Sequence, residues 1–102
     1  MEPGSHLTVI ATYHMSPASE AGFRDLLRGH WAILERLGMV EPEHAQVFRQ
    51  QNDEGITYVE IFTWKPGAVG RAHEHPEVAR VWERMEDFCT AMEFPHYARV
   101  EL

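Results

Sequence analysis

The order of strand-like and helix-like segments is the feature that most limits what this chain can fold into. Residues 7–14 and 56–64 are rich in β-branched and aromatic side chains, which favours strands, and residues 44–51 and 97–102 are weaker segments of the same kind. One amphipathic helical pattern follows the first strand, and a second precedes the last. The predicted order βαββαβ is that of an α+β, ferredoxin-like fold, with a four-stranded antiparallel sheet and two helices on one face.

The first helical pattern has a recognisable start and end. Ser16 and Pro17 favour a helix start, with the serine as N-cap and the proline at the first helical position. Gly38 favours its end, because glycine readily adopts the left-handed conformation that follows a helix. The apolar stripe between them is formed by residues three or four apart: Phe23, Leu27, Trp31, Leu34 and Leu37.

The second helical pattern opens at Pro76 after a short flap. Pro66 and Gly67 break the strand before it, and residues 68–75 are predicted to form a short helical turn. The helix region is expected to end at Phe94 and Pro95. Its stripe has the most regular helical period in the chain: Val78, Val81, Trp82, Met85, Phe88, Cys89 and Met92.

Length and composition restrict the class of protein. With 102 residues the chain is expected to form one domain over residues 7–102, with residues 1–6 as an N-terminal tail. No apolar run approaches the ~20 residues that span a bilayer, and the start shows no signal-peptide pattern. The net charge of −7 argues against nucleic acid or an anionic membrane as a partner. The single cysteine, Cys89, fits a reducing, cytoplasmic location.

The third strand is apolar on both faces. Val59 and Ile61 point one way, whereas Tyr58, Phe62 and Trp64 point the other, because side chains alternate along a strand. Two helices cover only one face of such a sheet, so the other needs a partner. A homodimer through the open sheet face is therefore expected, since symmetric dimers are the commonest oligomers.

These features together resemble those of the dimeric α/β-barrel superfamily, and within it the antibiotic biosynthesis monooxygenase-like domains. The resemblance covers roughly residues 7–102, and these residues carry it: Pro17, Phe23, Trp64, Ala68, His73 and Trp82. It implies a dimeric α/β barrel and a monooxygenase that needs no cofactor. The implied substrate is a small aromatic or polycyclic phenolic molecule that activates oxygen itself once it is deprotonated.

The chain departs from the related haem-degrading enzymes on its first strand. Those enzymes use an asparagine there, together with a tryptophan and a histidine that Trp64 and His73 resemble. Here the first strand offers Val9, Ala11 and Tyr13 instead. The first alternative to the monooxygenase is a non-catalytic dimeric ligand-binding or stress-related protein. The second alternative is a protein that binds or degrades haem through His73.

Aromatic residues are predicted to line a cavity between the sheet and the helices. The strand contributes Tyr58, Phe62 and Trp64, and the helices contribute Phe23, Trp31 and Trp82. Such a cavity would hold a flat apolar or aromatic molecule. Ordinary core packing explains the same stripes equally simply.

Two side chains are predicted to take a proton from a phenolic substrate. His73 lies on the predicted flap beside the aromatic cavity, and a neutral histidine can take a phenolic proton near pH 7. Glu60 shares the strand face of Phe62 and Trp64, where burial would raise its pKa. The alternative for Glu60 is a cross-strand ion pair with Arg49.

The remaining reactive side chains carry weaker signals. His75 accompanies His73, but no further ligand set supports a metal site, so His75 is expected to cap the second helix. His14 and His30 are weaker candidates for a site, and His44 and His96 fit polar strand ends. Cys89 lies on the buried stripe and is expected to be inert. No phosphate-binding loop or serine nucleophile motif is present in the sequence.

Overall fold

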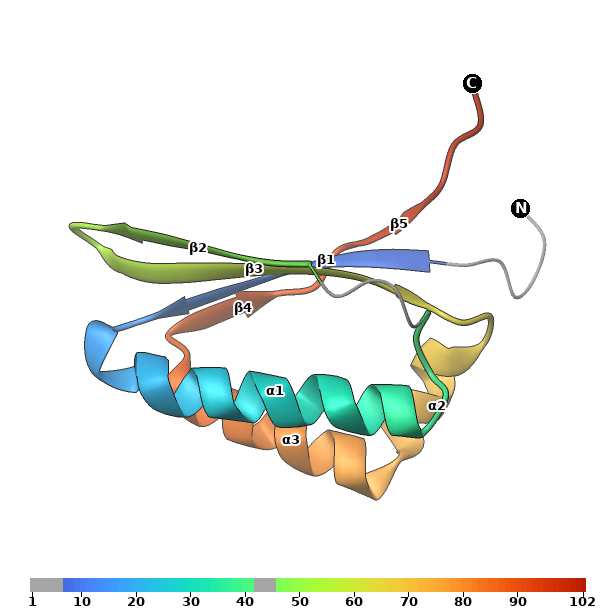
Figure 1. Cartoon of the computed structure of the whole chain (residues 1–102), viewed down its shortest axis with the longest axis horizontal. Coiled ribbons are helices and arrows are strands. Elements are labelled where there is room, and N and C mark those ends of the chain that lie inside the picture. Colours follow the sequence, from blue (N-terminus) through green and yellow to red (C-terminus); the bar gives the residue numbers. More distant parts are fainter. Residues whose placement is uncertain (1–6, 42–45) are drawn as a thin grey trace.

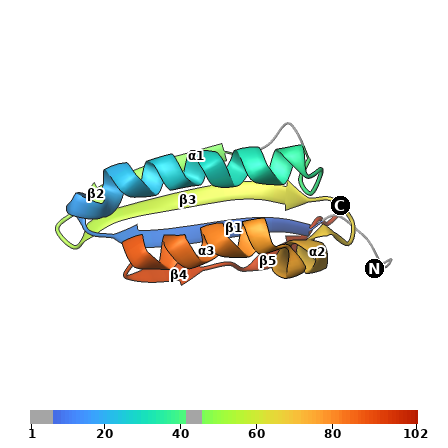
Figure 2. The same ribbon diagram turned by 90° about the horizontal axis from the view of Figure 1, so that it is seen from below.

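The computed structural model describes residues 7–41 and 46–102, which form one antiparallel sheet with helices on one face (Figures 1 and 2). A 3-10 turn, Pro17–Ser19, precedes the first helix. The other elements in chain order are β1 Leu7–Met15, α1 Glu20–Arg36, β2 Gln46–Asn52, β3 Gly55–Trp64, α2 Ala68–Glu74, α3 Pro76–Phe88, β4 Ala91–Glu93 and β5 His96–Ala98.

The sheet is centred on two long strands. β1 and β3 pair antiparallel over their whole length, from Leu7 opposite Trp64 to Met15 opposite Ile56. β2 lies outside β3, and both β4 and β5 pair with the other edge of β1. In Figure 2 α1 runs along β3 on its β2 side and α3 runs along β1 on its β4 side, so both helices lie on the same face of the sheet.

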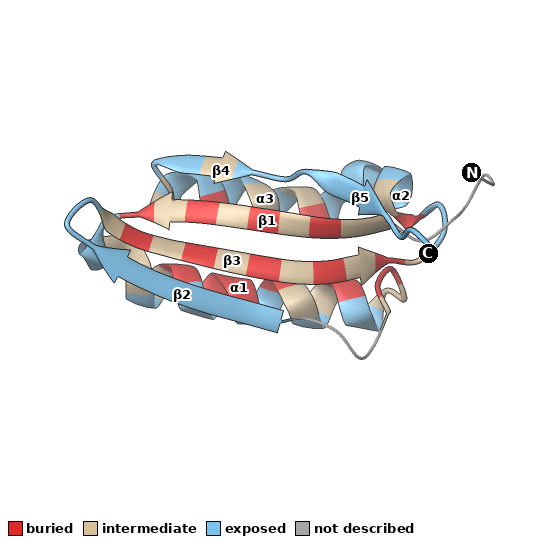
Figure 3. Ribbon diagram, turned by 90° about the horizontal axis from the view of Figure 1, so that it is seen from above, coloured by how far each residue is buried: buried red, intermediate tan, exposed pale blue. Residues whose placement is uncertain are grey.

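Buried and half-buried positions alternate along the whole of β3 and along β1 from Thr8 onward (Figure 3). On β3 the buried positions facing the helices are Ile56, Tyr58, Glu60, Phe62 and Trp64. The predicted face parity is therefore confirmed. The edge strand β2 is exposed at every position, and residues 44–45 of the predicted strand lie outside the described residues.

The predicted last strand, 97–102, is wrong in its bounds. Two three-residue strands, β4 and β5, take its place, so the sheet has five strands rather than four. Pro95 separates them because proline has no N–H to give to the ladder, while its carbonyl accepts the backbone N–H of Ile10. Residues 99–102 belong to no strand.

The predicted extent of the second helix is also wrong. α3 ends at Phe88, where Cys89 turns to an extended conformation with φ −107° and ψ 140°. Met92 therefore lies on β4, opposite Tyr13, and not on the helical stripe. The helical period predicted too long a helix because Met92 packs against the same core from β4 as it would from an extended α3.

The helix starts follow the sequence signals with one change. Pro17 opens the 3-10 turn, and Ser16 is extended before it but makes no side-chain capping bond. His75 caps α3 as predicted, because its Nδ1 accepts the backbone N–H of Glu77 at 3.2 Å. Gly38 has a φ of +69° just past α1, which explains why a glycine stands there.

The core between the sheet and the helices consists of two clusters. The first surrounds Tyr13, Phe23 and Tyr58 near the start of α1. The second surrounds Phe62 and Trp64 near the start of α3. None of the described helices is both long enough and apolar enough to cross a membrane.

Candidate functional site

A cavity of about 200 Å³ lies between the sheet and α3. Its wall is apolar and comes from both layers: Val9, Phe62, Trp64, Trp82, Met85 and Met92. Five polar side chains also reach it: Tyr13, His30, His73, Glu86 and His96. The aromatic wall can hold a flat ring, and the few polar groups can orient it.

The six aromatic residues that were predicted to line one cavity lie in three different parts of the structure. Phe62, Trp64 and Trp82 line the cavity. Phe23 is fully buried in the first core cluster, where its ring lies 4.9 Å from that of Tyr13. Trp31 and Tyr58 line a second, more open groove between α1 and β2, which Glu60 also borders.

His73 stands at the mouth of the cavity. It is exposed near the end of α2, and its ring packs edge-on against Trp82 with 4.9 Å between the centroids. The side chain can therefore touch both a bound ring and solvent. His75 is turned to the helix cap and does not line the cavity.

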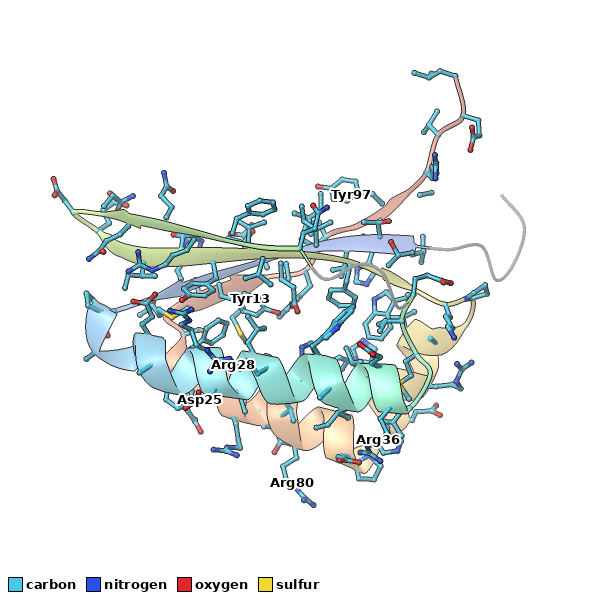
Figure 4. The ribbon with its side chains drawn as sticks, viewed as in Figure 1. Tyr13, Asp25, Arg28, Arg36, Arg80 and Tyr97 are labelled. Atoms are coloured by element: carbon cyan, nitrogen blue, oxygen red, sulfur yellow. The ribbon has the colours of Figure 1, made fainter. Side chains whose placement is uncertain are left out.

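Glu60 is buried behind the cavity and pairs with Tyr13. The Tyr13 hydroxyl donates a 2.8 Å hydrogen bond to Glu60 Oε1, and Glu60 is only 1% exposed. Burial raises the pKa of Glu60 to about 7, although the Tyr13 bond opposes the shift. Burial and the neighbouring Glu60 raise the pKa of Tyr13 well above its usual value. Figure 4 shows Tyr13 between the sheet and the helices.

The alternative pairing of Glu60 with Arg49 is wrong. Val47, not Arg49, lies opposite Glu60, because Arg49 is in register with Tyr58. The Arg49 guanidinium instead holds Glu20 of α1 with two bonds, one of them 2.9 Å long. That contact and the Tyr58 hydroxyl lower the pKa of Glu20 to about 2.

His30 occupies the opposite side of Glu60. The indole N–H of Trp82 donates to His30 Nε2 at 2.9 Å, so in the neutral ring the hydrogen sits on Nδ1. That Nδ1 lies 3.9 Å from Glu60 Oε2, and both atoms are buried with no hydrogen-bond partner. Burial lowers the pKa of His30 to about 4, so His30 and Glu60 tend to be neutral together rather than an ion pair.

His96 joins β5 to the cavity wall. Its Nε2 accepts the indole N–H of Trp64 at 3.2 Å, and its Nδ1 lies 2.8 Å from the carbonyl oxygen of Phe94. Both contacts are satisfied by one neutral tautomer, with the hydrogen on Nδ1.

Sequence reasoning missed Tyr13 as a cavity residue and gave His30 little weight. Strand parity held a signal for Tyr13, because it shares the inward face of β1 with Val9 and Ala11. Nothing local predicted that Met92 and Phe94 would close the cavity from the far edge of β1. Their place depends on the docking of β4.

Two other features bear on chemistry. Burial raises the pKa of the half-buried Cys89 thiol to about 11, which keeps it protonated and unreactive near neutral pH. In the part of the chain that the structure describes, no three His, Cys, Asp or Glu side chains are grouped to hold a metal ion.

The comparison with known proteins identifies solved structures of the same fold. No protein-family model and no curated protein matches the sequence. Among solved structures, a candidate antibiotic biosynthesis monooxygenase from Caulobacter crescentus superposes with a TM-score of 0.78 at 19% identity, covering 97% of this chain and 93% of its own. The chain has the fold of the antibiotic biosynthesis monooxygenase-like proteins.

Two further structures support the same statement. A variant of SnoaB, a cofactor-independent oxygenase from Streptomyces nogalater, gives a TM-score of 0.79 at 16% identity, with 96% of each chain covered. A candidate antibiotic biosynthesis monooxygenase from Nitrosomonas europaea gives 0.74 at 13% identity, covering 98% of this chain and 95% of its own. The predicted ferredoxin-like resemblance is confirmed at the level of the fold.

Proposed function

We propose that this protein is a monooxygenase that needs no cofactor and acts on a small phenolic aromatic molecule in the cavity between the sheet and α3. The observation that supports this most is the cavity itself, with Phe62, Trp64 and Trp82 as walls and His73 at its mouth. An engineered cavity of ~150 Å³ holds benzene. A volume of about 200 Å³ therefore suits one or two rings, with larger polycyclic molecules reaching out through the mouth.

The reaction begins with removal of a phenolic proton. A phenolate is electron-rich enough to reduce molecular oxygen: one oxygen atom enters the ring, the other leaves as water, and the phenol is oxidised to a quinone, so the substrate itself supplies the reducing power. His73 is the sequence-predicted base that lines the cavity, and a neutral imidazole accepts a proton near pH 7. The apolar wall excludes water and favours attack by oxygen over side reactions.

Oxygen consumption with 1-naphthol as the probe tests this function. We expect His73→Ala to lower kcat by roughly 10²-fold, as loss of a general base does. Glu74→Ala is the matched control, because Glu74 is an exposed neighbour on α2 outside the cavity. The melting temperatures of both variants should stay close to that of the unaltered protein.

The other outcomes separate the alternatives. Binding of 1-naphthol with no oxygen consumed at any pH would favour the non-catalytic ligand-binding protein. A Soret band that forms with haemin and disappears in His73→Ala would favour the haem-binding protein. An unchanged rate in His73→Ala would remove the histidine from the mechanism and leave Glu60, acting through Tyr13, as the proton acceptor.

We also propose that the protein is a homodimer joined through the open face of the sheet. That face carries the half-buried Ile10, Val59 and Ile61 on the two central strands. Phe48 on β2 and Tyr97 on β5 flank them and are 55% and 51% exposed. Figure 3 looks onto this face, which no helix covers. Contiguous apolar surface of this kind favours a partner, and a second copy supplies the same surface.

The dimer is tested by sedimentation at micromolar concentration. We expect a mass of two chains, and a mass of one chain in Ile61→Glu, because an unpaired charge in an apolar interface costs several kcal/mol, on the order of 3 or more. Ala32→Glu, on the exposed side of α1, is the control and should remain dimeric. A single-chain mass for the unaltered protein would contradict the proposal.

A further inference from the structure

The groove between α1 and β2 is a second hollow that the proposed function leaves unused. It measures about 470 Å³, within the ~300–1,000 Å³ range of small-molecule sites. None of the residues that line it also lines the cavity between the sheet and α3. A ligand bound here would therefore be separate from one bound in that cavity.

One wall of the groove is apolar. α1 contributes Leu27 and Trp31 to it, and β2 contributes Val47. Val47 lies opposite Glu60 on β3, so it points to the helix side of the sheet, yet 43% of it stays exposed. The Trp31 ring packs edge-on against Phe62, with 5.8 Å between the centroids, which fixes its position at the groove. The wall can therefore receive a flat ring without first rearranging.

The end of the groove near the start of α1 is polar. The Tyr58 hydroxyl donates to Glu20 at 2.6 Å, and the Arg49 guanidinium donates to the same carboxylate at 2.9 Å. Glu20 thereby ties α1 to both β2 and β3. Arg49 and Tyr58 line the groove, and this carboxylate holds both of them in place.

The positive charge at the groove is not fully balanced. Three of the nine Lys and Arg residues line it, although the chain has a net charge of −7. Arg49 is paired with Glu20, and Arg28 with Asp25. Among the described residues, the Arg24 guanidinium has no hydrogen bond or ion pair. Arg24 is therefore free to bind an anion.

The spacing along α1 sets the size of the ligand. Arg24, Leu27 and Trp31 occupy positions i, i+3 and i+7, which lie on one face of a helix. At about 1.5 Å per residue, Arg24 and Trp31 are ~10 Å apart along the helix axis. That is about the length of a carboxylate joined to two fused rings.

We propose that the groove between α1 and β2 is a binding site for an aromatic carboxylate. The ring system packs on Leu27, Trp31 and Val47, and the carboxylate accepts hydrogen bonds from Arg24. The planar guanidinium presents its N–H groups as a fork that matches the two oxygens of a carboxylate. Glu60 also borders the groove, but burial raises its pKa to about 7, so below that pH it stays largely uncharged.

The inference goes beyond the proposed function and does not depend on it. The cavity beside α3 takes a phenol and needs His73, whereas the groove takes an acid and needs Arg24. The protein would then hold two aromatic molecules at once, and the failure of one site would leave the other intact.

The indole N–H signals of the three tryptophans in an NMR spectrum report on the two sites separately. Trp31 lines the groove, whereas Trp64 and Trp82 line the cavity. Trp31→Phe assigns the groove signal by its loss. Titration with 2-naphthoate at pH 6 should move the Trp31 signal. We expect 2-naphthalenemethanol, which has the same rings and no charge, to bind on the order of tenfold more weakly, because it lacks the hydrogen bond between charged groups.

Arg24→Ala tests the place of the carboxylate. It should weaken the binding of 2-naphthoate about tenfold and change that of the alcohol by less than about twofold. Arg80→Ala is the matched control, since it removes the same charge from an exposed position of α3 that is turned away from the sheet (Figure 4). At ~0.1 M salt it should change both dissociation constants by less than about twofold, because distant exposed charges are screened.

Every outcome either supports or overturns the inference. It is overturned if 2-naphthoate leaves the Trp31 signal in place, if the acid and the alcohol bind equally, or if Arg24→Ala has no more effect than Arg80→Ala. Movement of the Trp64 and Trp82 signals alone would put the acid in the cavity and would overturn it as well. A Trp31 signal that moves and depends on Arg24 supports the inference even if no phenol consumes oxygen, a result that would overturn only the proposed oxygenase.

Discussion

The buried pair of Glu60 and His30 should make two opposite contributions to the pH dependence of stability that cancel. Each is nearly inaccessible, with 1% and 2% of its surface exposed. The pKa of Glu60 rises from its usual 4.5 to about 7, and that of His30 falls from 6.5 to about 4, in both cases because burial disfavours the charged form. The two shifts are similar in size and opposite in sign.

The sign of each contribution follows from proton binding in the two states. Between pH 4.5 and about 7 the folded protein keeps the Glu60 proton that the unfolded chain has released. The free energy of unfolding is therefore highest below pH 4.5 and falls as the pH rises through about 7. For His30 the unfolded chain binds the proton below pH 6.5 and the folded protein does not. Its contribution is complete above pH 6.5 and is lost as the pH falls through about 4.

The size follows from the same shifts. Each spans about 2.5 pH units at about 1.4 kcal/mol per unit, which gives about 3 kcal/mol for each residue. Between pH 4.5 and 6.5 the two slopes are equal and opposite. The pair then adds almost no pH dependence, although each member alone adds a large one.

Single variants should expose the cancellation. Relative to the unaltered protein, His30→Gln should become less stable by about 3 kcal/mol as the pH rises from 4 to 6.5, because only the Glu60 contribution remains. Glu60→Gln should become more stable by a similar amount as the pH rises from 4.5 to 7. The glutamine at position 30 can still accept the Trp82 N–H, and the glutamine at position 60 has nearly the shape of the glutamate.

Urea unfolding at constant protein concentration, followed by circular dichroism from pH 4 to 7.5, measures these differences. Subtracting the unaltered protein removes the contributions of the other carboxylates, such as Glu20. Constant protein concentration is needed because a dimer gains stability by mass action. If the stability difference from the unaltered protein does not change with pH for either variant, the buried pair is not neutral. If it changes in the same direction for both variants, one of the two residues does not have the pKa shift given to it here.

Further predictions concern packing, charge and metals. Gly22→Ala should destabilise the protein by about 1 kcal/mol or more, because the new Cβ would lie 2.5 Å from the Phe88 ring. Gly29→Ala should raise the free energy of unfolding by up to ~1 kcal/mol, because no atom lies within 4 Å of its new Cβ and alanine favours a helix; thermal unfolding measures both. Arg49→Ala should leave the midpoint of urea unfolding close to that of the unaltered protein, because its ion pair with Glu20 is exposed enough to be screened by solvent. A clearly lower midpoint would contradict this. Dialysis against a chelator should leave the melting temperature unchanged, and loss of about one equivalent of metal with unfolding would contradict this.

Local features of the sequence account for much of the fold. Strand alternation alone placed Tyr58, Phe62 and Trp64 on the helix-covered face, since a period of two leaves no choice once one residue is assigned. Proline and histidine at 75–76 set the start of α3, and Gly38 the end of α1. These signals succeed because each depends on neighbours within a few residues.

The partner of each polar group in the site depended instead on contacts between distant segments. Glu60 faces Ala11 across the sheet and reaches Tyr13 as a diagonal neighbour, which follows from the register of β1 against β3. The sequence offered Arg49 as a cross-strand partner of Glu60, but the register of β2 against β3 places Arg49 opposite Tyr58. A shift of two residues between β2 and β3 would have put Arg49 opposite Glu60, and no local pattern specified the register.

The sequence by itself determined the order of the elements, the inward face of β3 and the aromatic character of the core, because propensity, periodicity and capping are local properties. Only the tertiary structure decided which aromatic residues share a cavity. Phe23 and Trp82 lie on similar stripes, yet packing puts the first in a filled cluster and the second beside open space. It also decided that Pro95 divides the last strand and that β4 and β5 close the cavity along β1. Cavities arise where layers from distant parts of the chain fail to fill the space between them, and that mismatch exists only once the layers have met.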